Sequence, residues 1–446
     1  MLASRLYWTA YLAWQLPGQA AFPFASKERI RRAQSRRVRR MVEHAWRTVP
    51  YYQDTMRRLG LTAADFQGAE DLARLPLLEP RQLQRDPEHF LSTKRPRDSY
   101  LPLMTSGSTC QPRTIFYDAP ALFQNAAHSD RDRAVLRAAL GRWAGYREAV
   151  IDSPSNATVR LVQRFVAGRA WFPRGLGIQR QYFALIDPPE RNARLLAEFR
   201  PDLLQSYGSY LDMLFPYLAR HGLRIDGLKA VVYTSDRLSD NVRRLIEERF
   251  GLPVFSIYGA VETFKVAFQC RYGAGLHLNS DLYPVRIIDA HGREVPPGET
   301  GEVVVSNLVN RGTVLLNYRL GDVASLLPDD CPCGRKLPLL SFPTGRTDEL
   351  IELPSGEVIH PRIFKEILNT ETELWQYQVR QTAPSRFQVL LVAGPGAGRE
   401  AIRRRLDEKL ASAFAKPITT ELLFVEQLER TSGGKIPAIM AWRGEP

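Results

Sequence analysis

Residues 228–262 read LKAVVYTSDRLSDNVRRLIEERFGLPVFSIYGAVE, and their pattern indicates the fold class. Runs of apolar and β-branched residues predict strands over 228–233 and 253–258. The amphipathic segment between them predicts a helix over 240–250. A strand, a helix and a second strand in succession are typical of a parallel sheet. We therefore predict an α/β fold. Because ligands of such sheets bind at the carboxyl ends of the strands, Tyr258–Glu262 is the first candidate site.

The same alternation of strands and helices extends over about 100–260, which predicts parallel sheets with flanking helices. From 280 to 345 the chain changes to short strands and turns, which predicts an antiparallel subdomain. After Asp348 the pattern restarts, with strands over 387–392 and 420–425 and a helix over 400–414. A chain of 446 residues can bury two cores. We predict a large N-terminal domain over 1–347 and a small, mobile α+β C-terminal domain over 348–446.

The formal net charge of +13 raises the question of an anionic partner. Much of the charge lies in arginines between 29 and 40, interleaved with apolar residues such as Ile30 and Val38. That pattern predicts an amphipathic helix whose arginines form the solvated side. The chain contains no recognised nucleic-acid motif, so we predict no nucleic-acid partner.

The N-terminal run Leu6–Phe24 is aromatic and aliphatic, but Gln15, Pro17 and Gly18 interrupt it. The uninterrupted apolar part is too short to span a membrane. We expect an aromatic-rich helix that docks on the body of the protein, and a peripheral position near a membrane is left open. Four cysteines in so long a chain do not make a disulfide framework. A reducing, cytoplasmic location fits them best. The sequence leaves open whether the protein is a homodimer.

Between two apolar segments lies a loop rich in hydroxyl groups and glycine, TSGSTCQPR, at residues 105–113. Its hydroxyls and backbone N–H groups can wrap the oxygens of a polyphosphate, and Gly107 lets the backbone come close. The Gly-Lys-Ser/Thr ending of a P-loop is missing. Taken alone, the loop fits an ordinary polar turn equally well.

Four further motifs follow in order along the chain. The ring of Tyr258 can stack on a base, and the Glu262 carboxylate can hold Mg²⁺ against phosphate. The motif Tyr318–Asp322 presents an acid on a turn, suited to ribose hydroxyls. Gly345–Asp348 supplies a cation at the domain junction, and Thr431–Ile436 carries a lysine on a Gly-Gly loop. Each motif alone is compatible with a common turn or a solvated side chain.

In this order the motifs resemble the adenylate-forming superfamily of acyl-CoA synthetases and peptide-synthetase adenylation domains. Within it the chain is similar to the branch of phenylacetate–CoA ligases and capsule-type coenzyme A ligase-like proteins. Three segments carry that narrower resemblance: Val49-Pro50-Tyr51-Tyr52, Gly275-Leu276-His277 and Cys331-Pro332-Cys333-Gly334-Arg335. The resemblance covers nearly the whole chain. It implies a large adenylate-forming domain followed by a small mobile one.

The resemblance also implies roles for single residues. The ATP phosphates would be cradled by Thr105, Ser106, Gly107, Ser108 and Thr109. Adenine would be flanked by Tyr258 and Gly259, with Ser235 and Asp236 where the family often has a Gly-Glu pair. Glu262 would bind Mg²⁺. Asp322 would hold the ribose with support from Arg346, Asp348 would be the hinge, and Lys435 would stabilise charge during adenylation.

Three further positions depart from the family pattern. The phosphate loop usually continues with glycine and later lysine, where this chain has Cys110 and Arg113. A hydroxyl residue usually precedes the acid, where this chain has Val261. These departures leave a weakened or specialised member open.

Three cysteines and one histidine, Cys270, His277, Cys331 and Cys333, are enough for a closed tetrahedral zinc site. The Cys-x-Cys spacing is less diagnostic than Cys-x₂-Cys, and two unrelated pairs of thiols are the alternative. Members of the resembled branch can carry a metal at these positions. The resemblance therefore implies a structural zinc ion.

We expect an ATP- and Mg²⁺-dependent enzyme that activates an organic carboxylate as acyl-AMP and passes the acyl group to coenzyme A. A carrier-protein thiol or an amine is the alternative acceptor, and a non-catalytic member of the fold is the alternative class. Aromatic residues within 150–260 give a mild preference for an aryl or apolar acid.

Overall fold

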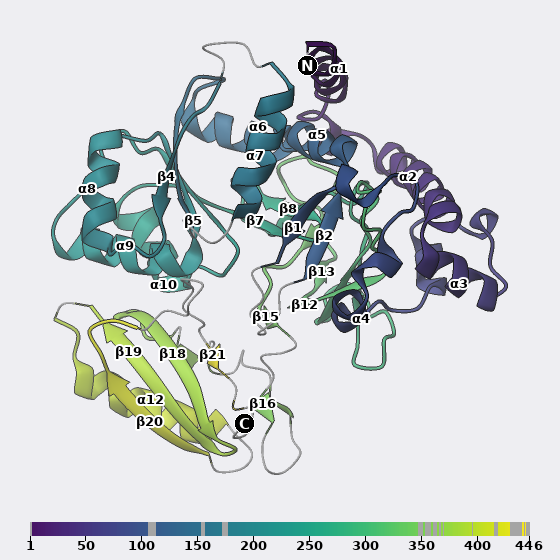
Figure 1. The fold of residues 1–446 in the computed structure, drawn as a ribbon. Helices are drawn as coiled ribbons and strands as arrows, with labels where there is room; N and C mark the ends of the chain where they lie inside the picture. Colours follow the sequence, from purple (N-terminus) through teal and green to yellow (C-terminus); the bar gives the residue numbers. More distant parts are fainter. Residues whose placement is uncertain are drawn as a thin grey trace. The chain divides into compact units, whose positions relative to one another are not determined.

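The computed structural model describes residues 2–105, 113–152, 157–171, 177–346, 351–352, 358–359, 364, 367–368, 370–394, 396–413, 418–428, 439–440 and 442. The chain forms two compact units, each assembled from segments far apart in the sequence (Figure 1). Unit 1 comprises 1–145, 156–177 and 255–342, and unit 2 comprises 146–155, 178–254 and 343–446. Within the described residues, no helix is both long enough and apolar enough to cross a membrane.

Unit 1 contains seven α-helices among its described residues. They are α1 (Leu2–Gln15), α2 (Lys27–Thr48), α3 (Pro50–Arg58), α4 (Pro80–Arg85), α5 (Ala119–His128), α6 (Asp130–Leu140) and α7 (Ala157–Arg169). Short 3₁₀ helices cover Phe22–Phe24, Ala63–Asp65, Glu70–Arg74, Pro87–Phe90 and Arg97–Ser99. The hydroxyl of Ser26 accepts a hydrogen bond from Arg29 N and so caps α2. As predicted, α2 buries an apolar stripe that includes Ile30 and Val38.

The strands of unit 1 form three antiparallel arrangements. A hairpin joins β1 (Leu101–Met104) to β2 (Thr114–Tyr117), and a second group runs in the order β7 (Val254–Ala260), β8 (Phe264–Gln269), β9 (Leu276–Leu278), β14 (Leu339–Leu340), β13 (Leu326–Leu327). The third comprises β10 (Val285–Ile288), β11 (Gly301–Val305) and β12 (Tyr318–Ala324). This last group confirms the antiparallel subdomain predicted over 280–345.

The middle of the chain gives unit 2 a parallel sheet, with strand order β4 (Gln179–Ala184), β3 (Arg147–Asp152), β5 (Leu203–Tyr207), β6 (Ala230–Thr234). Its register pairs Glu148 with Leu203 and Leu204 with Val231, all in parallel. The helices are α8 (Pro189–Phe199), α9 (Gly208–Arg220) and α10 (Asp240–Arg244), which continues as a π-helix over Leu245–Arg249. The predicted strand, helix and parallel sheet are confirmed.

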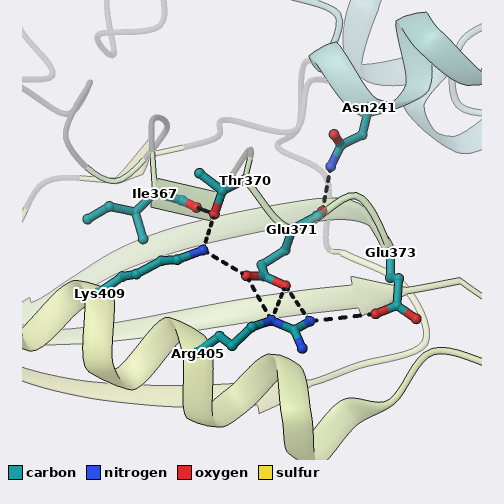
Figure 2. Close-up of polar contacts among 7 residues, drawn as sticks. All are labelled: Asn241, Ile367, Thr370, Glu371, Glu373, Arg405 and Lys409. Carbon is teal, nitrogen blue, oxygen red and sulfur yellow. Dashed lines mark hydrogen bonds and ion pairs between the residues drawn. The ribbon is translucent and has the colours of Figure 1, made fainter.

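The C-terminal part of unit 2 is a four-stranded sheet with order β20 (Thr419–Phe424), β19 (Arg386–Ala393), β18 (Leu374–Ala383), β21 (Ile439–Met440), plus α12 (Arg399–Ala413). Short strands β15 (Gly345–Arg346), β16 (Ile351–Glu352) and β17 (Val358–Ile359) precede it. Helix α12 buries its apolar side chains in the same core as the sheet. The Asn241 amide donates to the Glu371 carbonyl at 2.9 Å (Figure 2). It also donates to the Leu374 carbonyl at 2.8 Å. The domain boundary near Asp348 stays a prediction.

Candidate active site

The two ends of the hydroxyl-rich loop leave the β1–β2 hairpin side by side. Thr105 N donates to the Arg113 carbonyl at 2.9 Å, and Arg113 N donates to Thr105 Oγ1 at 2.9 Å. The hydroxyl of Thr105 is therefore held by the backbone that closes the loop. Ser106, Gly107, Ser108 and Thr109 lie outside the described residues, so their role at the phosphates stays a prediction.

Glu262 follows β7 and is 4% exposed. Its Oε1 lies 3.5 Å from Arg113 Nη2 and accepts a hydrogen bond from the Tyr318 hydroxyl at 3.3 Å. The Asn307 amide donates to the Glu262 carbonyl at 2.8 Å, and the Tyr117 hydroxyl donates to the Val261 carbonyl at 2.7 Å. The backbone and the carboxylate of Glu262 are thus both fixed, and the phosphate-loop residue Arg113 is its facing cation.

Tyr258 and Asp322 lie on β7 and β12, and the structure brings them together. The Tyr258 hydroxyl donates to Asp322 Oδ2 at 2.7 Å. The β7–β8 turn that follows is tight, because a Cβ added at Gly259 would lie 2.1 Å from the Phe264 carbonyl oxygen. Phe264 itself has a φ of +63°, which ordinary residues rarely adopt. The backbone at position 259 therefore requires glycine, independently of any contact that Gly259 would make with a ligand.

Ser235 and Asp236 follow β6 in unit 2. Ser235 has a φ of +72°. The Asp236 carboxylate accepts bonds from Ser209 N at 3.1 Å and from the Ser209 hydroxyl at 2.6 Å, at the start of α9. This contact holds the β6–α10 connection against α9. The role of the pair beside adenine stays a prediction.

Three remaining predicted residues are not placed by side-chain contacts. The backbone of Arg346 ends β15, but its side chain is not among the described ones. Asp348 and Lys435 lie outside the described residues. Their roles as ribose contact, hinge and adenylation lysine stay predictions.

Two residues of the site were not predicted as site residues, namely Arg113 and Tyr318. Arg113 stands where the resembled family has a lysine in the loop, and that replacement was the available signal. Tyr318 is the first residue of the Tyr318–Asp322 motif, in which the acid, Asp322, was predicted as the site residue. No pattern in the sequence ties its hydroxyl to Glu262.

Cys270, His277, Cys331 and Cys333 converge, as predicted. Their ligand atoms all lie within 4.8 Å of one another. Cys270 Sγ lies 3.5 Å from Cys331 Sγ, and Cys333 Sγ lies 3.3 Å from His277 Nε2. His277 is held on β9, opposite Phe268 on β8 and Leu339 on β14. Strands far apart in sequence thus bring three sulfur atoms and one nitrogen atom to a common point.

The environment of the cluster shifts the pKa values of three of its ligands. Burial, with the nearby Arg335 charge, lowers the pKa of His277 to about 4, so the imidazole is neutral at pH 7. Burial raises the pKa of the Cys333 thiol, but hydrogen bonds from Arg335 outweigh this and lower it. Burial raises the pKa of the Cys331 thiol. A divalent metal would favour the thiolates, because metal binding displaces thiol protons.

Comparison with known proteins places this geometry in a family. Residues 64–310 match the family described as AMP-binding enzymes. The chain is 24% identical to the phenylacetate–coenzyme A ligase of Thermus thermophilus, over 94% of this chain and 97% of that protein. It is 26% identical to the Escherichia coli phenylacetate–coenzyme A ligase, over 80% of each, and 18% identical to protein CapK of Staphylococcus aureus, over 90% and 87%.

A crystal structure of 2-hydroxyisobutyryl-CoA ligase, in its postadenylation state with a bound acyl-AMP, has the same fold. The TM-score is 0.78 at 19% identity, covering 96% of this chain and 92% of that one. The family match spans more than half of the chain and includes the phosphate loop, Tyr258 and Glu262. This protein belongs to the family of AMP-binding enzymes.

Proposed function

We propose that this protein is an AMP-forming carboxylate–coenzyme A ligase that uses ATP and coenzyme A. Family membership and the named CoA ligases among its relatives support the reaction class. The observation that carries the proposal is the joint placement of Tyr258, Asp322, Glu262 and Arg113 in one unit. These residues supply a ring, a ribose-binding acid, a metal-binding acid and a phosphate-binding cation.

The reaction takes place in two displacements. An oxygen of the substrate carboxylate attacks the α-phosphorus of ATP, and the bond from that phosphorus to the pyrophosphate oxygen breaks. The sulfur of coenzyme A then attacks the acyl carbon, the carbon–oxygen bond to AMP breaks, and the thiol proton leaves to solvent. Neither step needs a nucleophilic side chain, so positioning and charge stabilisation are what the protein must supply.

Binding of the nucleotide follows from the contacts at Asp322. Its carboxylate would accept hydrogen bonds from the ribose hydroxyls, and the Tyr258 hydroxyl orients that carboxylate through the 2.7 Å bond. The Tyr258 ring would lie beside adenine. Arg113, with its planar fork of donors, suits phosphate oxygens and would act together with the hydroxyls of Thr105 to Thr109.

A magnesium ion fits the donor at Glu262. Mg²⁺ takes oxygen ligands and is commonly held by one carboxylate plus substrate phosphates. The Glu262 carboxylate is fixed by Tyr318 and faces Arg113, so a phosphate bound by Arg113 would lie beside it. When bound, the metal would neutralise charge on the phosphates. Glu262 would hold the ion and Arg113 would hold the phosphate.

A zinc ion fits the four-residue cluster. Three sulfurs and one imidazole nitrogen complete a tetrahedral site, which leaves no position for water or substrate. We therefore assign the cluster a structural role. Its thiols are unbridged, which also supports a reducing, cytoplasmic location.

The two half-reactions would divide between two arrangements of the chain. The large domain over 1–347 would bind ATP and acid, with Ser235 and Asp236 beside adenine. The small domain over 348–446 would turn about Asp348, bring Lys435 to the carboxylate for adenylation, and withdraw it for thiol attack. Arg346 would support the ribose next to the hinge.

A pyrophosphate-release screen over carboxylic acids, with and without coenzyme A, tests the proposal. We expect release with an apolar or aryl acid, with acyl-CoA appearing only when coenzyme A is present. Acyl transfer to a carrier-protein thiol or to an amine, with none to coenzyme A, would show that coenzyme A is not the acceptor. Absence of pyrophosphate release with every acid would contradict catalysis.

A further inference from the structure

One face of α1 is apolar and uncovered. Trp8, Tyr11 and Leu12 pack into the core of unit 1, where Trp8 stacks on Phe123 with ring centroids 4.5 Å apart. The opposite face carries Leu2, Leu6, Tyr7 and Trp14, of which Leu6 is 54% exposed and Trp14 is 74% exposed. Arg5 is the only charged residue of this helix. Within the described chain, nothing covers this face.

A basic cleft of about 530 Å³ lies between α1 and α2, beside the apolar face. Trp14 and Tyr11 line one side, and Arg36 and Arg40 line the other. The cations that line the cleft are Arg36, Arg37, Arg40, Lys94, Arg95, Arg131 and Arg311, and the carboxylates are Asp118 and Asp281. Positive charge therefore exceeds negative charge in the cleft.

Both carboxylates are already engaged. Asp281 accepts from Arg131 at 2.7 and 3.0 Å, with Arg37 at 4.0 Å. Asp118 caps α5 by accepting from Ala121 N at 3.3 Å.

Five cations remain in the cleft. They are exposed, and their side chains make no ion pair or hydrogen bond with other residues that the structure describes: Arg36, Arg40, Lys94, Arg95 and Arg311. The cleft can therefore bind external anions through several cations at once.

The cleft is distinct from the ATP site. Tyr100 and Asp118 line the cleft and flank the end of the β1–β2 hairpin where Leu101 pairs with Tyr117. The phosphate loop leaves the other end, where Met104 pairs with Thr114. The length of these strands, roughly 10–13 Å at the usual rise per residue, separates the two ends. Phosphates of ATP at the loop would leave the cleft free.

We infer that α1 and this cleft form a peripheral membrane-docking surface for bilayers that contain acidic phospholipids. The apolar face of α1 would enter the interface, where tryptophan and tyrosine are favoured. The free cations of the cleft, with the outward arginines of α2, would bind the phosphate headgroups.

Two other occupants fit the surface less well. A soluble anion would use the cations but leave the apolar face of α1 exposed to water. A second copy of the chain would bring identical basic surfaces together across a two-fold interface, and juxtaposed like charges oppose association. An acidic bilayer matches both the charge and the apolar face.

Vesicle flotation with the full chain tests the inference. We expect the protein to float with vesicles of phosphatidylcholine containing one third phosphatidylglycerol, weakly with phosphatidylcholine alone, and less in high salt. Arg36→Gln with Arg40→Gln should weaken partition roughly thirtyfold, since each basic residue near an acidic surface contributes about fivefold. Leu6→Gln with Trp14→Gln should also reduce flotation on acidic vesicles.

Matched variants carry the same substitutions away from the cleft. Arg81→Gln with Arg85→Gln removes two exposed arginines of α4, and Leu59→Gln with Leu223→Gln removes two exposed leucines. Both pairs should float like the wild type, and all variants should melt like it. Equal loss in test and control pairs would overturn the inference. Failure of the wild-type protein to float with acidic vesicles would also overturn the inference. This holds whether the protein instead binds glycerol phosphate in solution or dimerises through α1.

Discussion

Glu262 is the proposed ligand of the magnesium ion that accompanies ATP. Its buried carboxylate faces Arg113 of the loop at 105–113. Glu262→Gln keeps the size of the side chain and removes its charge. We expect kcat/KM for ATP with magnesium to fall by roughly 10²–10³, while KM for the acid changes little. Steady-state pyrophosphate release with each substrate varied in turn measures both. Unchanged ATP kinetics would remove the metal role from Glu262.

Asp212 on α9 gives a pH dependence of stability. Burial raises its pKa from 3.8 to about 8, although Ser239 N and the Ser239 hydroxyl both donate to it. Between those pH values the native state holds a proton that the unfolded chain has released. The free energy of unfolding therefore falls as pH rises, by up to about 1.4 kcal/mol per pH unit.

Asp212→Asn keeps an acceptor for Ser239 and cannot ionise. We expect the variant to gain stability relative to the wild type as pH rises from about 5 to 8, measured by urea unfolding at several pH values. A difference between the two proteins that does not change with pH would show that Asp212 does not titrate in this window.

The sequence could predict Tyr258, Glu262 and Asp322 because each is a chemically distinctive residue that belongs to a strand or a turn in a specific order. It could not predict that Arg113 faces Glu262. That pairing depends on how β2 packs against the β7–β8 connection, where Tyr117 contacts Phe264 and the Val261 carbonyl, and no local pattern encodes such a tertiary contact. Arg113, the proposed phosphate-binding cation, was visible only as a departure from the family pattern.

At the scale of elements, the ten-residue strand β18 was not predicted, although β19, α12 and β20 were. Its sequence, LWQYQVRQTA, places glutamines where a buried strand usually has apolar residues. Gln376, Gln378 and Gln381 are buried. The Gln376 amide donates to the Asp212 carbonyl, and the Gln381 amide donates to the Pro384 carbonyl. These hydrogen bonds to backbone carbonyls, of which the bond to Asp212 is tertiary, compensate for the burial of Gln376 and Gln381. The sequence pattern does not reveal such bonds.

An ion-pair network joins α12 to the segment before β18 (Figure 2). The Glu371 carboxylate is 3% exposed and accepts from Arg405 at 2.6 Å and from Lys409 at 3.0 Å. Glu373 is more exposed and lies 3.6 Å from Arg405. Hydrogen bonding from Arg405 lowers the pKa of Glu371. The ionised Glu371 carboxylate therefore contributes to the free energy of unfolding above about pH 4.5. This contribution is lost as pH falls through the lowered pKa of Glu371.

Glu371→Gln should lower the free energy of unfolding by about 1–3 kcal/mol at pH 7, because it removes charge-assisted hydrogen bonds. Glu373→Gln is the matched control and should change it by no more than about 1 kcal/mol, as for exposed pairs. Chemical denaturation of both variants measures the difference. Equal effects of the two substitutions would contradict a special role for the buried carboxylate.

The Cys₃His cluster should hold about one zinc ion per chain, since one tetrahedral ion uses all four ligands. His277→Gln should lose the metal and lower the melting temperature, with activity falling only as a consequence. The matched control His291→Gln changes an exposed histidine and should keep both the bound zinc and the melting temperature of the wild type. Elemental analysis and thermal melts measure the outcome. A wild-type protein without zinc, or a metal-free variant that melts like the wild type, would remove the structural role.

At the scale of the molecule, the domain boundary near Asp348 stays a prediction, and the two compact units are each assembled from segments that alternate along the chain. Residues 146–155 and 178–254 belong with the C-terminal part in unit 2. Within that unit, Asn241 binds the carbonyls of Glu371 and Leu374. Changes in composition along a chain indicate local secondary structure, and they carry no information on which distant segments bury surface together.

The proposed turn about Asp348 predicts that Lys435 serves one half-reaction only. Lys435→Ala should lower the rate of adenylate formation by roughly 10²–10³, the loss expected for a charge directed at a transition state. Thioester formation from preformed acyl-AMP should continue near the wild-type rate. Single-turnover kinetics of each half-reaction separate the two. Equal loss in both would count against alternation.

In the proposed reaction the substrate carboxylate itself attacks the α-phosphorus of ATP. The most direct measurement uses an accepted acid labelled with oxygen-18 in both carboxylate oxygens, together with ATP and coenzyme A. One labelled oxygen should appear in AMP and the other should stay in the acyl thioester, because the carbon–oxygen bond to AMP breaks in the second step. Label found in pyrophosphate or inorganic phosphate, or AMP without label beside labelled acyl-CoA, would contradict this reaction.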